Sequence, residues 1–316
     1  MTEGSNFLDG RILVVAFEGW NDAGEAASGA VRTLKDVLDV VPIAEVDPES
    51  YFDFQFNRPV VTDDDGHRRL IWPSAVVYGP ANPSAEPADL AGDANLRVSG
   101  DNVGNIYLLL GTEPSRSWKS FTAEILDAAL AADVGAIVFL GAMLADVPHT
   151  RPISIFASSE NPAVRAELGI ERSTYEGPVG ILSALSEGAE EVGIPTVSIW
   201  ASVPHYVHNA PSPKAMLALI DKLEELVDVT IPRGALVDEA AAWEAGIDAL
   251  AADDEEMAAY IEQLEQARDT VDSPEASGEA IAQEFERYLR RRGDGRDGRD
   301  GQAGGRPPGP DEPWRN

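Results

Sequence analysis

The sequence predicts an α/β fold built on a mostly parallel sheet with helices on both faces. Two observations lead to this prediction. Almost uninterrupted apolar, β-branched runs recur along the chain, and strands of this kind are covered on both faces. Segments with helical periodicity stand between these runs, and this alternation is typical of parallel sheets.

The first strand–helix unit shows the pattern clearly. Residues 11–17 read RILVVAF, with almost no polar alternation, and predict a buried strand. A turn follows, and a helix is expected over residues 23–38 with Asn21 or Asp22 as its cap. The apolar stripe of this helix consists of Ala27, Val31, Leu34 and Leu38.

The same alternation continues through most of the chain. Further strands are expected at residues 105–110, 135–140, 153–157 and 194–200. Further helices are expected at residues 117–131, 162–168, 181–191 and 212–227.

Two stretches depart from this alternation. Residues 52–102 are rich in Pro, Asp and Gly and predict a β-rich excursion, with a hairpin-like turn at Gly66. The C-terminal part is helical instead. A stripe that starts at Leu236 and resumes after the acidic residues 253–254 predicts a pair of helices with one apolar seam.

The chain is therefore expected to have three parts. Residues 8–233 form the α/β core, and residues 234–292 form an acidic helical region that ends in a helix at 278–292. Residues 293–316 are rich in Gly and Pro with almost no apolar content, and are expected to be disordered.

Composition excludes several classes of function. The 316 residues include 55 Asp and Glu against 24 Lys and Arg, a formal net charge of −31. Nucleic acids and anionic membranes attract basic surfaces, so neither is an expected partner. There is no cysteine, which excludes disulfides, thiolate nucleophiles and cysteine zinc sites.

The expected location is the cytoplasm. Residues 1–9 lack a basic segment followed by an apolar stretch, which a secretory signal requires. The longest apolar run without charge is residues 134–145, whereas a membrane-spanning helix needs about 20 residues.

Polar side chains gather in the loops that follow the expected strands. Ligands of open parallel sheets bind beyond the carboxyl ends of the strands, so these residues are a candidate ligand-binding rim with groups for acid–base chemistry. The alternative is that Asp22 caps a helix, Glu113 pairs with Arg151, and the histidines satisfy buried carbonyl groups. The candidate rim consists of Glu18, Trp20, Asn21, Asp22, Glu113, Asp146, His149, Arg151 and His205.

No complete catalytic or cofactor motif accompanies this rim. Residues 19–24 imitate a phosphate loop, but Glu25 stands where that loop requires Lys. Ser186 resembles a nucleophile elbow without the preceding strand. His205 and His208 have no third metal ligand nearby, and the sequence has no G-x-G-x-x-G. No metal or cofactor is therefore expected.

The acidity is concentrated near the C-terminus. Residues 237–289 hold 16 acidic and 2 basic residues, a net charge of −14 and nearly half of the total. Such helices either cover their own core or dock on a partner, and a basic partner would favour this region.

Four segments together resemble one known family. They read VVAFEGWNDAG at 14–24, LGAMLADVPHTRP at 140–152, GPVGI at 177–181 and IPTVSIWASVPHY at 194–206. With these motifs the chain is similar to the proteasome assembly chaperone family (type two), in its actinobacterial branch. The resemblance runs from about residue 8 to residue 292.

The resemblance implies a three-layer α/β/α sandwich like that of the nucleoside phosphorylases, present as a homo-oligomer, with a trimer favoured. It also implies a role in binding proteins, because characterised relatives chaperone proteasome subunits without established enzymatic activity. Some relatives dock through a C-terminal hydrophobic–Tyr–any tripeptide. This chain ends in Trp314-Arg315-Asn316 and departs from that pattern at Arg315.

Two functions follow as hypotheses. The first is a cytoplasmic, non-enzymatic, homo-oligomeric factor that binds or assembles an unidentified protein. The second is a nucleoside-like small-molecule binding protein, hydrolase or phosphorylase that uses the candidate rim. The second requires the rim side chains to converge on one concave site.

Overall fold

The computed structural model describes residue 7 and residues 10–64, 66–81, 98 and 103–272. The helix expected at 278–292 and the expected disordered tail lie outside these residues. The chain forms two compact units, residues 1–265 and 266–316, and the description below concerns the first. The three-part division of the chain stays a prediction.

The strands of the described residues form one large sheet and one small one. The large sheet has seven strands in the order β2-β5-β6-β1-β7-β9-β8. Strands β3 and β4 pair only with each other. The strands are β1 (Arg11–Glu18), β2 (Val40–Glu45), β3 (Val60–Asp64), β4 (His67–Ile71), β5 (Ala75–Pro80), β6 (Ile106–Thr112), β7 (Val134–Ala145), β8 (Ile155–Ser158) and β9 (Thr196–Pro204).

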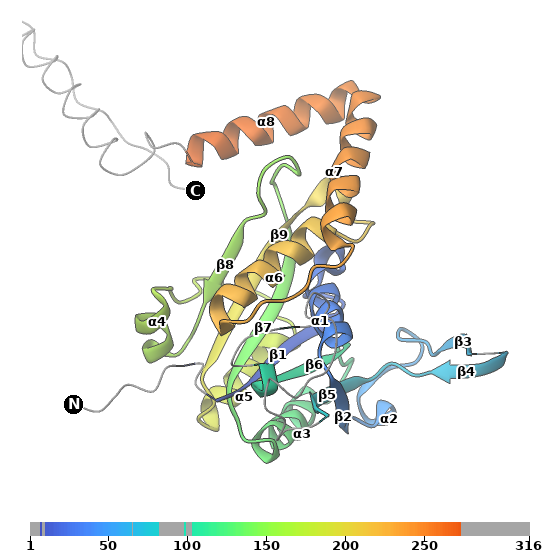
Figure 1. Ribbon diagram of the computed structural model, residues 1–316, viewed down its shortest axis with the longest axis vertical. Coiled ribbons are helices and arrows are strands. Elements are labelled where there is room, and N and C mark those ends of the chain that lie inside the picture. The colour runs from blue at the N-terminus through green and yellow to red at the C-terminus, as the bar shows by residue number, and fades with distance from the viewer. Residues whose placement is uncertain (1–6, 8–9, 65, 82–97, 99–102, 273–316) are drawn as a thin grey trace, which may run out of the picture. The chain divides into compact units, whose positions relative to one another are not determined.

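Helices cover both faces of the seven-stranded sheet (Figure 1). In β1, Val14 contributes to the core cluster shared with α1 and α6, whereas Val15 contributes to the cluster shared with α3 and α5. The fold is thus the predicted α/β/α sandwich. The helices are α1 (Ala26–Val37), α2 (Pro48–Tyr51), α3 (Trp118–Ala131), α4 (Pro162–Leu168), α5 (Ile181–Glu191), α6 (Pro213–Val227), α7 (Leu236–Ala252) and α8 (Glu255–Asp272).

The sheet is parallel in its centre and antiparallel towards its edges. Strands β6, β1, β7 and β9 run parallel to their neighbours in this group, which confirms the mostly parallel sheet. Strand β5 runs antiparallel to both β6 and β2, and β8 runs antiparallel to β9. Strand β2 was not predicted, because Pro42 and its exposed positions do not give the pattern of a buried strand.

Two central strands are longer than predicted. Strand β7 continues to Ala145 and β9 continues to Pro204, and the two remain paired over these last residues. Strand β1 already ends at Glu18. The ends of β7 and β9 therefore form a two-stranded ribbon, hereafter the β7–β9 ribbon, that extends beyond the carboxyl edge of β1.

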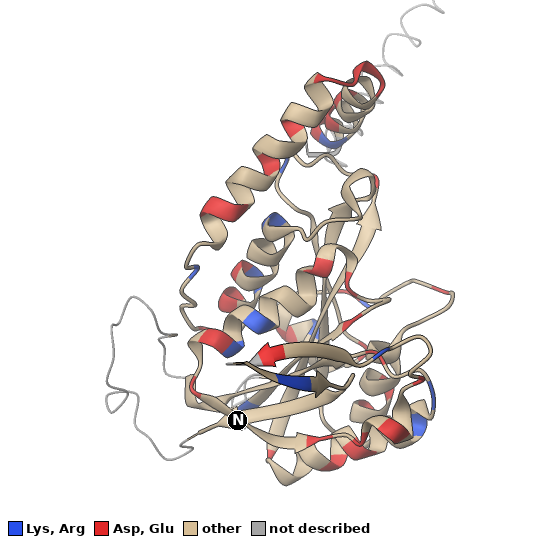
Figure 2. Ribbon diagram, turned by 90° about the vertical axis from the view of Figure 1, so that its right-hand side faces the viewer, with Lys and Arg blue, Asp and Glu red and all other residues tan. Residues whose placement is uncertain are grey.

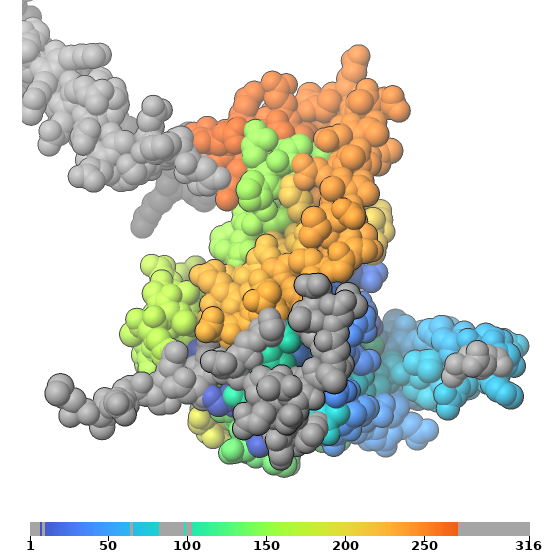
Figure 3. All heavy atoms as spheres, viewed as in Figure 1, coloured from blue at the N-terminus to red at the C-terminus, as the bar shows by residue number. Residues whose placement is uncertain are grey.

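The small sheet is a hairpin that stands out from the side of the unit (Figures 1 and 3). Strands β3 and β4 pair from Val60↔Ile71 to Asp64↔His67. The turn predicted at Gly66 is present, with Gly66 at φ +81°, a value that glycine adopts without steric cost. We call residues 60–71 the β-arm.

Helix α7 packs on the core unit. Its residues Leu236, Ala240 and Ile247 are buried, and α7 lies against α6. Leu250 is 63% exposed and does not belong to the buried stripe. The predicted apolar seam thus faces α6 rather than a paired helix. Within the described residues, no helix is both long enough and apolar enough to cross a membrane.

Candidate functional site

The N-terminal side of α1 holds the first group of rim residues. The carboxylate of Asp22 accepts hydrogen bonds from the backbone N–H groups of Ala27 (2.8 Å) and Ser28 (3.1 Å). A 3₁₀ turn with left-handed Gly24 and Glu25 precedes the helix, so α1 begins at Ala26 rather than at residue 23. Asp22 caps it from across this turn. Burial raises the pKa of the Asp22 carboxyl above its usual value.

Glu113 joins three segments that are distant in sequence. Its Oε1 accepts a hydrogen bond from the backbone N–H of Ile181 (2.8 Å), the first residue of α5, and one from Nδ2 of Asn21 (3.2 Å). Asn21 is 97% buried (3% exposed). A Cβ on Gly180 would lie 2.3 Å from Nδ2 of Asn21, so the close approach of these loops requires glycine at that position.

Glu18 completes this group from the end of β1. Its carboxylate pairs with the guanidinium of Arg32 on α1 and accepts a hydrogen bond from the hydroxyl of Thr112 (3.3 Å). The expected ion pair between Glu113 and Arg151 does not form, because Glu113 bonds Asn21 and Ile181 instead. Each carboxylate near the end of β1 therefore has a partner inside the fold.

Trp20 differs from its polar neighbours because it is 71% exposed. Other exposed apolar side chains flank the segments that contact Asn21. Met143 follows Ala142, whose N–H donates to the carbonyl of Asn21, and Val179 precedes Gly180. Tyr175 belongs to the same segment as Val179, because its hydroxyl donates to the carbonyl of Pro178. We call the exposed side chains of these segments, Trp20, Met143, Tyr175 and Val179, the Trp20 surface.

The second group lies at the far end of the β7–β9 ribbon, with His149 at its centre. The His149 side chain is fully buried. Its Nδ1 lies 2.9 Å from the hydroxyl of Tyr206, and its Nε2 lies 3.0 Å from Oδ1 of Asp248 on α7. The Tyr206 hydroxyl also accepts the backbone N–H of His149 (2.7 Å). This pattern fits a ring with its proton on Nε2, donated to the carboxylate.

Further bonds attach α7 to the same loop. The Lys214 ammonium donates to the carbonyl of His149 and to the carboxylate of Glu244, both at 2.5 Å. The Trp243 ring meets the His149 ring edge to face, with centroids 6.3 Å apart. Burial raises the pKa of Tyr206 to about 12, so its hydroxyl keeps its proton at neutral pH. We call His149 and these partners, Tyr206, Lys214, Trp243, Glu244 and Asp248, the His149 cluster. Its contacts hold α7 on the core.

The remaining rim residues contact the first part of α8. Nδ1 of His205 lies 3.2 Å from Oδ1 of Asp146, and the Tyr260 hydroxyl donates to that same oxygen (3.4 Å). Arg151 pairs with Glu265 at 3.3 Å. Burial and the nearby Asp146 carboxylate raise the pKa of Tyr260.

The longer β7 explains why the rim residues separate into two groups. Ala142 of β7 lies level with Asp22, to which it is bridged. Asp146 comes four residues later, which corresponds to roughly 13 Å along a strand at about 3.3 Å per residue. The β7–β9 ribbon carries Asp146, His149, Arg151 and His205 away from Glu18, Asn21, Asp22 and Glu113.

None of the nine rim residues lines either of two hollows found on the described surface. These hollows lie between β8 and α6 and are lined by residues of those elements and their neighbours. Among the described residues, no cluster of three or more His, Asp or Glu side chains has the arrangement of a metal site. That the nine rim residues bind a ligand stays a prediction.

Several partners in these networks were not singled out from the sequence. Tyr206, Lys214 and Arg32 each bond a rim residue or its backbone. Tyr206 directly follows His205, a predicted rim residue, so its position in the sequence could have indicated it. Lys214 and Arg32 lie on helices and are distant in sequence from their partners, so no local spacing reveals them.

Comparison with known proteins identifies relatives of this chain. A family model described as PAC2 family matches residues 16–251. A PAC2 family protein from Streptomyces avermitilis is 41% identical, with a TM-score of 0.68, over 79% of this chain and 99% of that chain. A proteasome-assembly chaperone homologue from Mycobacterium tuberculosis is 38% identical, with a TM-score of 0.66, over the same two shares. Among curated proteins, none matches.

A much less similar archaeal protein has the same fold. PbaA from Pyrococcus furiosus, a homologue of proteasome-assembly chaperone, is 17% identical with a TM-score of 0.52, over 83% of this chain and 96% of that chain. At this identity the likeness concerns the fold alone. The family model and the two actinobacterial relatives, in contrast, cover most of the sequence and include both groups of rim residues. The chain belongs to the PAC2 family.

Proposed function

We propose that this chain is a cytoplasmic, homo-oligomeric factor without catalytic activity that binds another protein and assists its assembly. The observation that carries the proposal is a contrast at the carboxyl edge of β1. There the carboxylates of Glu18, Asp22 and Glu113 bond to groups of the fold itself, while the neighbouring Trp20 is 71% exposed.

This contrast favours a protein partner over a small polar substrate. A catalytic acid or base needs its proton-transfer atom available to a substrate, and the three carboxylates are engaged in a cap, a loop junction and an ion pair. Exposed aromatic and aliphatic side chains, in contrast, are typical of protein interaction sites. The Trp20 surface is therefore the proposed partner site.

Two further features support the proposal. A relative that is 38% identical is described as a proteasome-assembly chaperone homologue, so a proteasome subunit is the first candidate partner. Acidic residues also recur along α7 (Figure 2). Asp238 and Glu239 are exposed there, and such a surface would accelerate the approach of a basic partner.

Affinity capture with the full chain tests the proposal. Trp20→Ala removes the largest exposed side chain of the Trp20 surface. Leu130→Ala is the matched control, because Leu130 is an exposed apolar residue on α3, 48% exposed. We expect one specific protein to be retained by the wild type and the control, and to be lost with Trp20→Ala. Equal retention by all three proteins would contradict the proposed partner site.

The homo-oligomeric part of the proposal has a separate test. Light scattering of the purified full chain should give a multiple of 33.8 kDa, with three copies favoured. The mass of a single copy at every concentration tested would contradict it.

A further inference from the structure

Strand β8 has an open backbone edge. It is the last strand of the seven-stranded sheet and runs antiparallel to β9. In such a pair, residues whose N–H and C=O groups bond the neighbouring strand alternate with residues whose groups point the other way. The N–H of Ser202 in β9 donates to the carbonyl of Ser154 (3.0 Å), and by the register of the two strands Phe156 is the next residue with this orientation. The backbone groups of Ile155 and Ala157 therefore point away from the sheet.

The chain itself uses one end of this edge for backbone pairing. The N–H of Ser159, directly after β8, donates to the carbonyl of Glu171 (3.2 Å), and Ser158 is bridged to Glu171 in parallel. This pairing does not continue along β8, because no described residue bonds the outward backbone groups of Ile155 or Ala157. An open edge of this kind is a template for another extended backbone.

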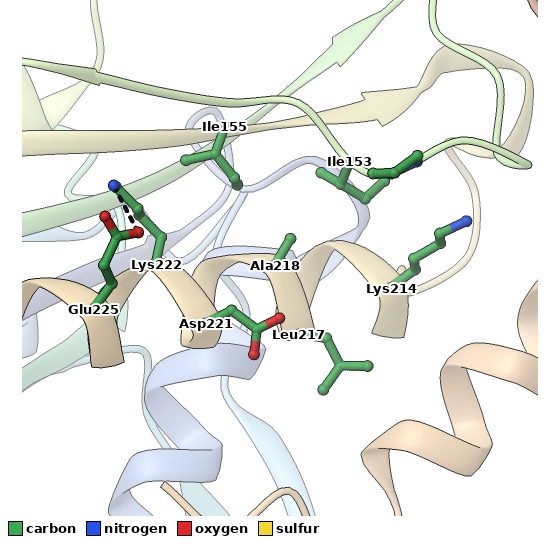
Figure 4. A pocket seen from close by; sticks show the side chains of 9 residues that line it. Ile153, Ile155, Lys214, Leu217, Ala218, Asp221, Lys222 and Glu225 are labelled. Carbon is green, nitrogen blue, oxygen red and sulfur yellow. Dashed lines mark hydrogen bonds and ion pairs between the residues drawn. The ribbon is translucent and has the colours of Figure 1, made fainter. Parts of the chain in front are cut away.

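A groove between β8 and α6 borders this edge. It has a volume of about 460 Å³. Figure 4 shows Ile153 and Ile155 facing α6 across it, with Leu217 and Ala218 on the helix. Ala157 lines a smaller hollow of about 120 Å³ nearby. A further strand beside β8 would lie about 4.8 Å from it, so that every second side chain of this strand would point towards the groove.

The charges that line the groove are balanced and paired. They come from two cations and two carboxylates, Lys214, Asp221, Lys222 and Glu225. Lys222 and Glu225 pair with each other at 2.9 Å. Lys214 and Asp221 pair with residues outside the groove, each at 2.5 Å. A charged side chain that entered the groove would lose hydration without gaining an unpaired partner among these four residues, so an uncharged occupant matches the groove best.

The open backbone groups decide which kind of occupant fits. A helix could cover the apolar side chains of the groove, but its own backbone groups are bonded internally. It would leave the N–H and C=O groups of Ile155 and Ala157 without partners, and burying such groups unpaired is costly. An extended segment supplies backbone partners to the edge and alternate side chains to the groove at the same time.

We propose that the outer edge of β8 and the adjoining groove bind an extended, uncharged segment of another protein, which adds to the sheet as a further strand. Every second side chain of this segment is apolar and lies in the groove between β8 and α6. The site does not include the Trp20 surface. The proposal depends neither on the protein that binds there nor on the number of copies in the oligomer.

A pair of modified peptides tests the backbone pairing on the full wild-type chain. The probe is an uncharged, fluorescent peptide of about six residues in which Val alternates with Thr, and fluorescence anisotropy measures its binding. One version is N-methylated on its Val residues and the other on its Thr residues, so that each version lacks the N–H groups along one edge of its strand.

Only one edge of the added strand faces β8, so the two versions should differ. We expect one of them to bind about tenfold or more weakly than the unmodified probe, and the other to bind within about threefold of it. The version that loses affinity reports the direction of the added strand, because groove-facing residues bond β8 only in an antiparallel pair. Equal affinities of the two versions, or no binding of the unmodified probe at millimolar concentration, would overturn the proposal.

A variant of β8 locates the site. Ala157→Pro removes an outward N–H that β9 does not use, and proline is tolerated at such edge positions. It should weaken binding of the probe about tenfold. Phe156→Ala is the matched control, because this side chain is 53% exposed and lies on the opposite face of the sheet from Ile155. The control should bind the probe within about threefold of the wild type, and equal binding by Ala157→Pro would contradict the proposed edge.

Hydrogen exchange locates the site without any substitution. In the wild type saturated with the probe, the amides of Ile155 and Ala157 should exchange about tenfold more slowly or less, and protection confined to other strands would overturn the proposal. Two other occupants of the edge would also overturn it. A lower mass of Ala157→Pro than of the wild type in light scattering would assign the edge to a second copy. Probe binding that appears only after removal of residues 273–316 would assign it to the chain itself.

Discussion

The junction at Glu113 gives the sharpest test of whether the carboxyl edge is structural. In Glu113→Ala, the N–H of Ile181 and the buried amide of Asn21 lose their common acceptor. A hydrogen bond to a charged group contributes about 1.5–3 kcal/mol, and a weaker one about 0.5–1.5 kcal/mol. Since the bond to Ile181 is short (2.8 Å) and that to Asn21 is longer (3.2 Å), we expect a loss of about 2–4 kcal/mol.

The assay is thermal and urea unfolding of the full chain. For a domain of this size a loss of 1 kcal/mol lowers Tm by about 2–4 °C, so Glu113→Ala should melt roughly 4–16 °C below the wild type. Glu113→Gln keeps a neutral acceptor and should lose about half as much free energy. Glu187→Ala, on the exposed side of α5, is the matched control and should stay within about 0.5 kcal/mol of the wild type. A Glu113→Ala variant as stable as this control would refute the structural role.

Three other predictions concern the remaining networks. Burial raises the folded-state pKa of Asp22, so the folded state binds this proton more tightly than the unfolded state does. The free energy of unfolding should therefore fall as pH rises from 3.8 through that raised pKa. In urea titrations, Asp22→Asn should abolish this contribution to the pH dependence. Arg233, between α6 and α7, pairs with Glu224 of α6 at 2.5 Å, and its hydrogen bonds lower the pKa of that carboxyl. The part of the stabilisation that this pair contributes, about 1–3 kcal/mol, is lost in Arg233→Ala; it should be full at neutral pH and should disappear as pH falls through the lowered pKa. His149→Ala leaves the partners of a buried ring unpaired, and amides of α7 should exchange hydrogen about 10–100-fold faster.

Each of these has a control and a contradictory result. If the free energy of unfolding of the wild type increased relative to that of Asp22→Asn as pH rises, the predicted direction for Asp22 would be wrong. A difference between Arg233→Ala and the wild type that persists unchanged in acid would contradict the pairing with Glu224. For α7, Glu239→Ala on the exposed face is the control. If the amides of α7 exchanged as slowly in His149→Ala as in this control, the His149 cluster would not be what holds the helix on the core.

Most of the fold could be predicted because its signals are local. The continuous apolar run of β1 and the stripe of α1 follow from burial on both faces of a sheet and one face of a helix. Strand β2 could not be predicted, since it lies at the edge and mostly exposes its side chains. The antiparallel direction of β8 was not predicted either, because direction depends on the path of the intervening chain rather than on the residues of the strand.

The arrangement of the candidate site depended on information that no single segment contains. The sequence placed His149 and Glu113 in loops after strands, which is where the structure has them. Their separation follows from the continuation of β7 to Ala145, where the apolar run could equally have been loop. One partner of the His149 ring, Asp248, comes from α7, about 100 residues away in the chain, and only the packing of that helix on α6 brings the two together.

Hydrogen exchange of the full chain with and without its captured partner tests the central claim most directly. If the Trp20 surface is the partner site, amides of residues 19–22, 141–145 and 175–180 should exchange more slowly in the complex. Amides at the exposed end of α3, around Leu130, should be unaffected. Protection confined to other regions, with unchanged exchange around Trp20, would contradict the claim that this edge binds protein.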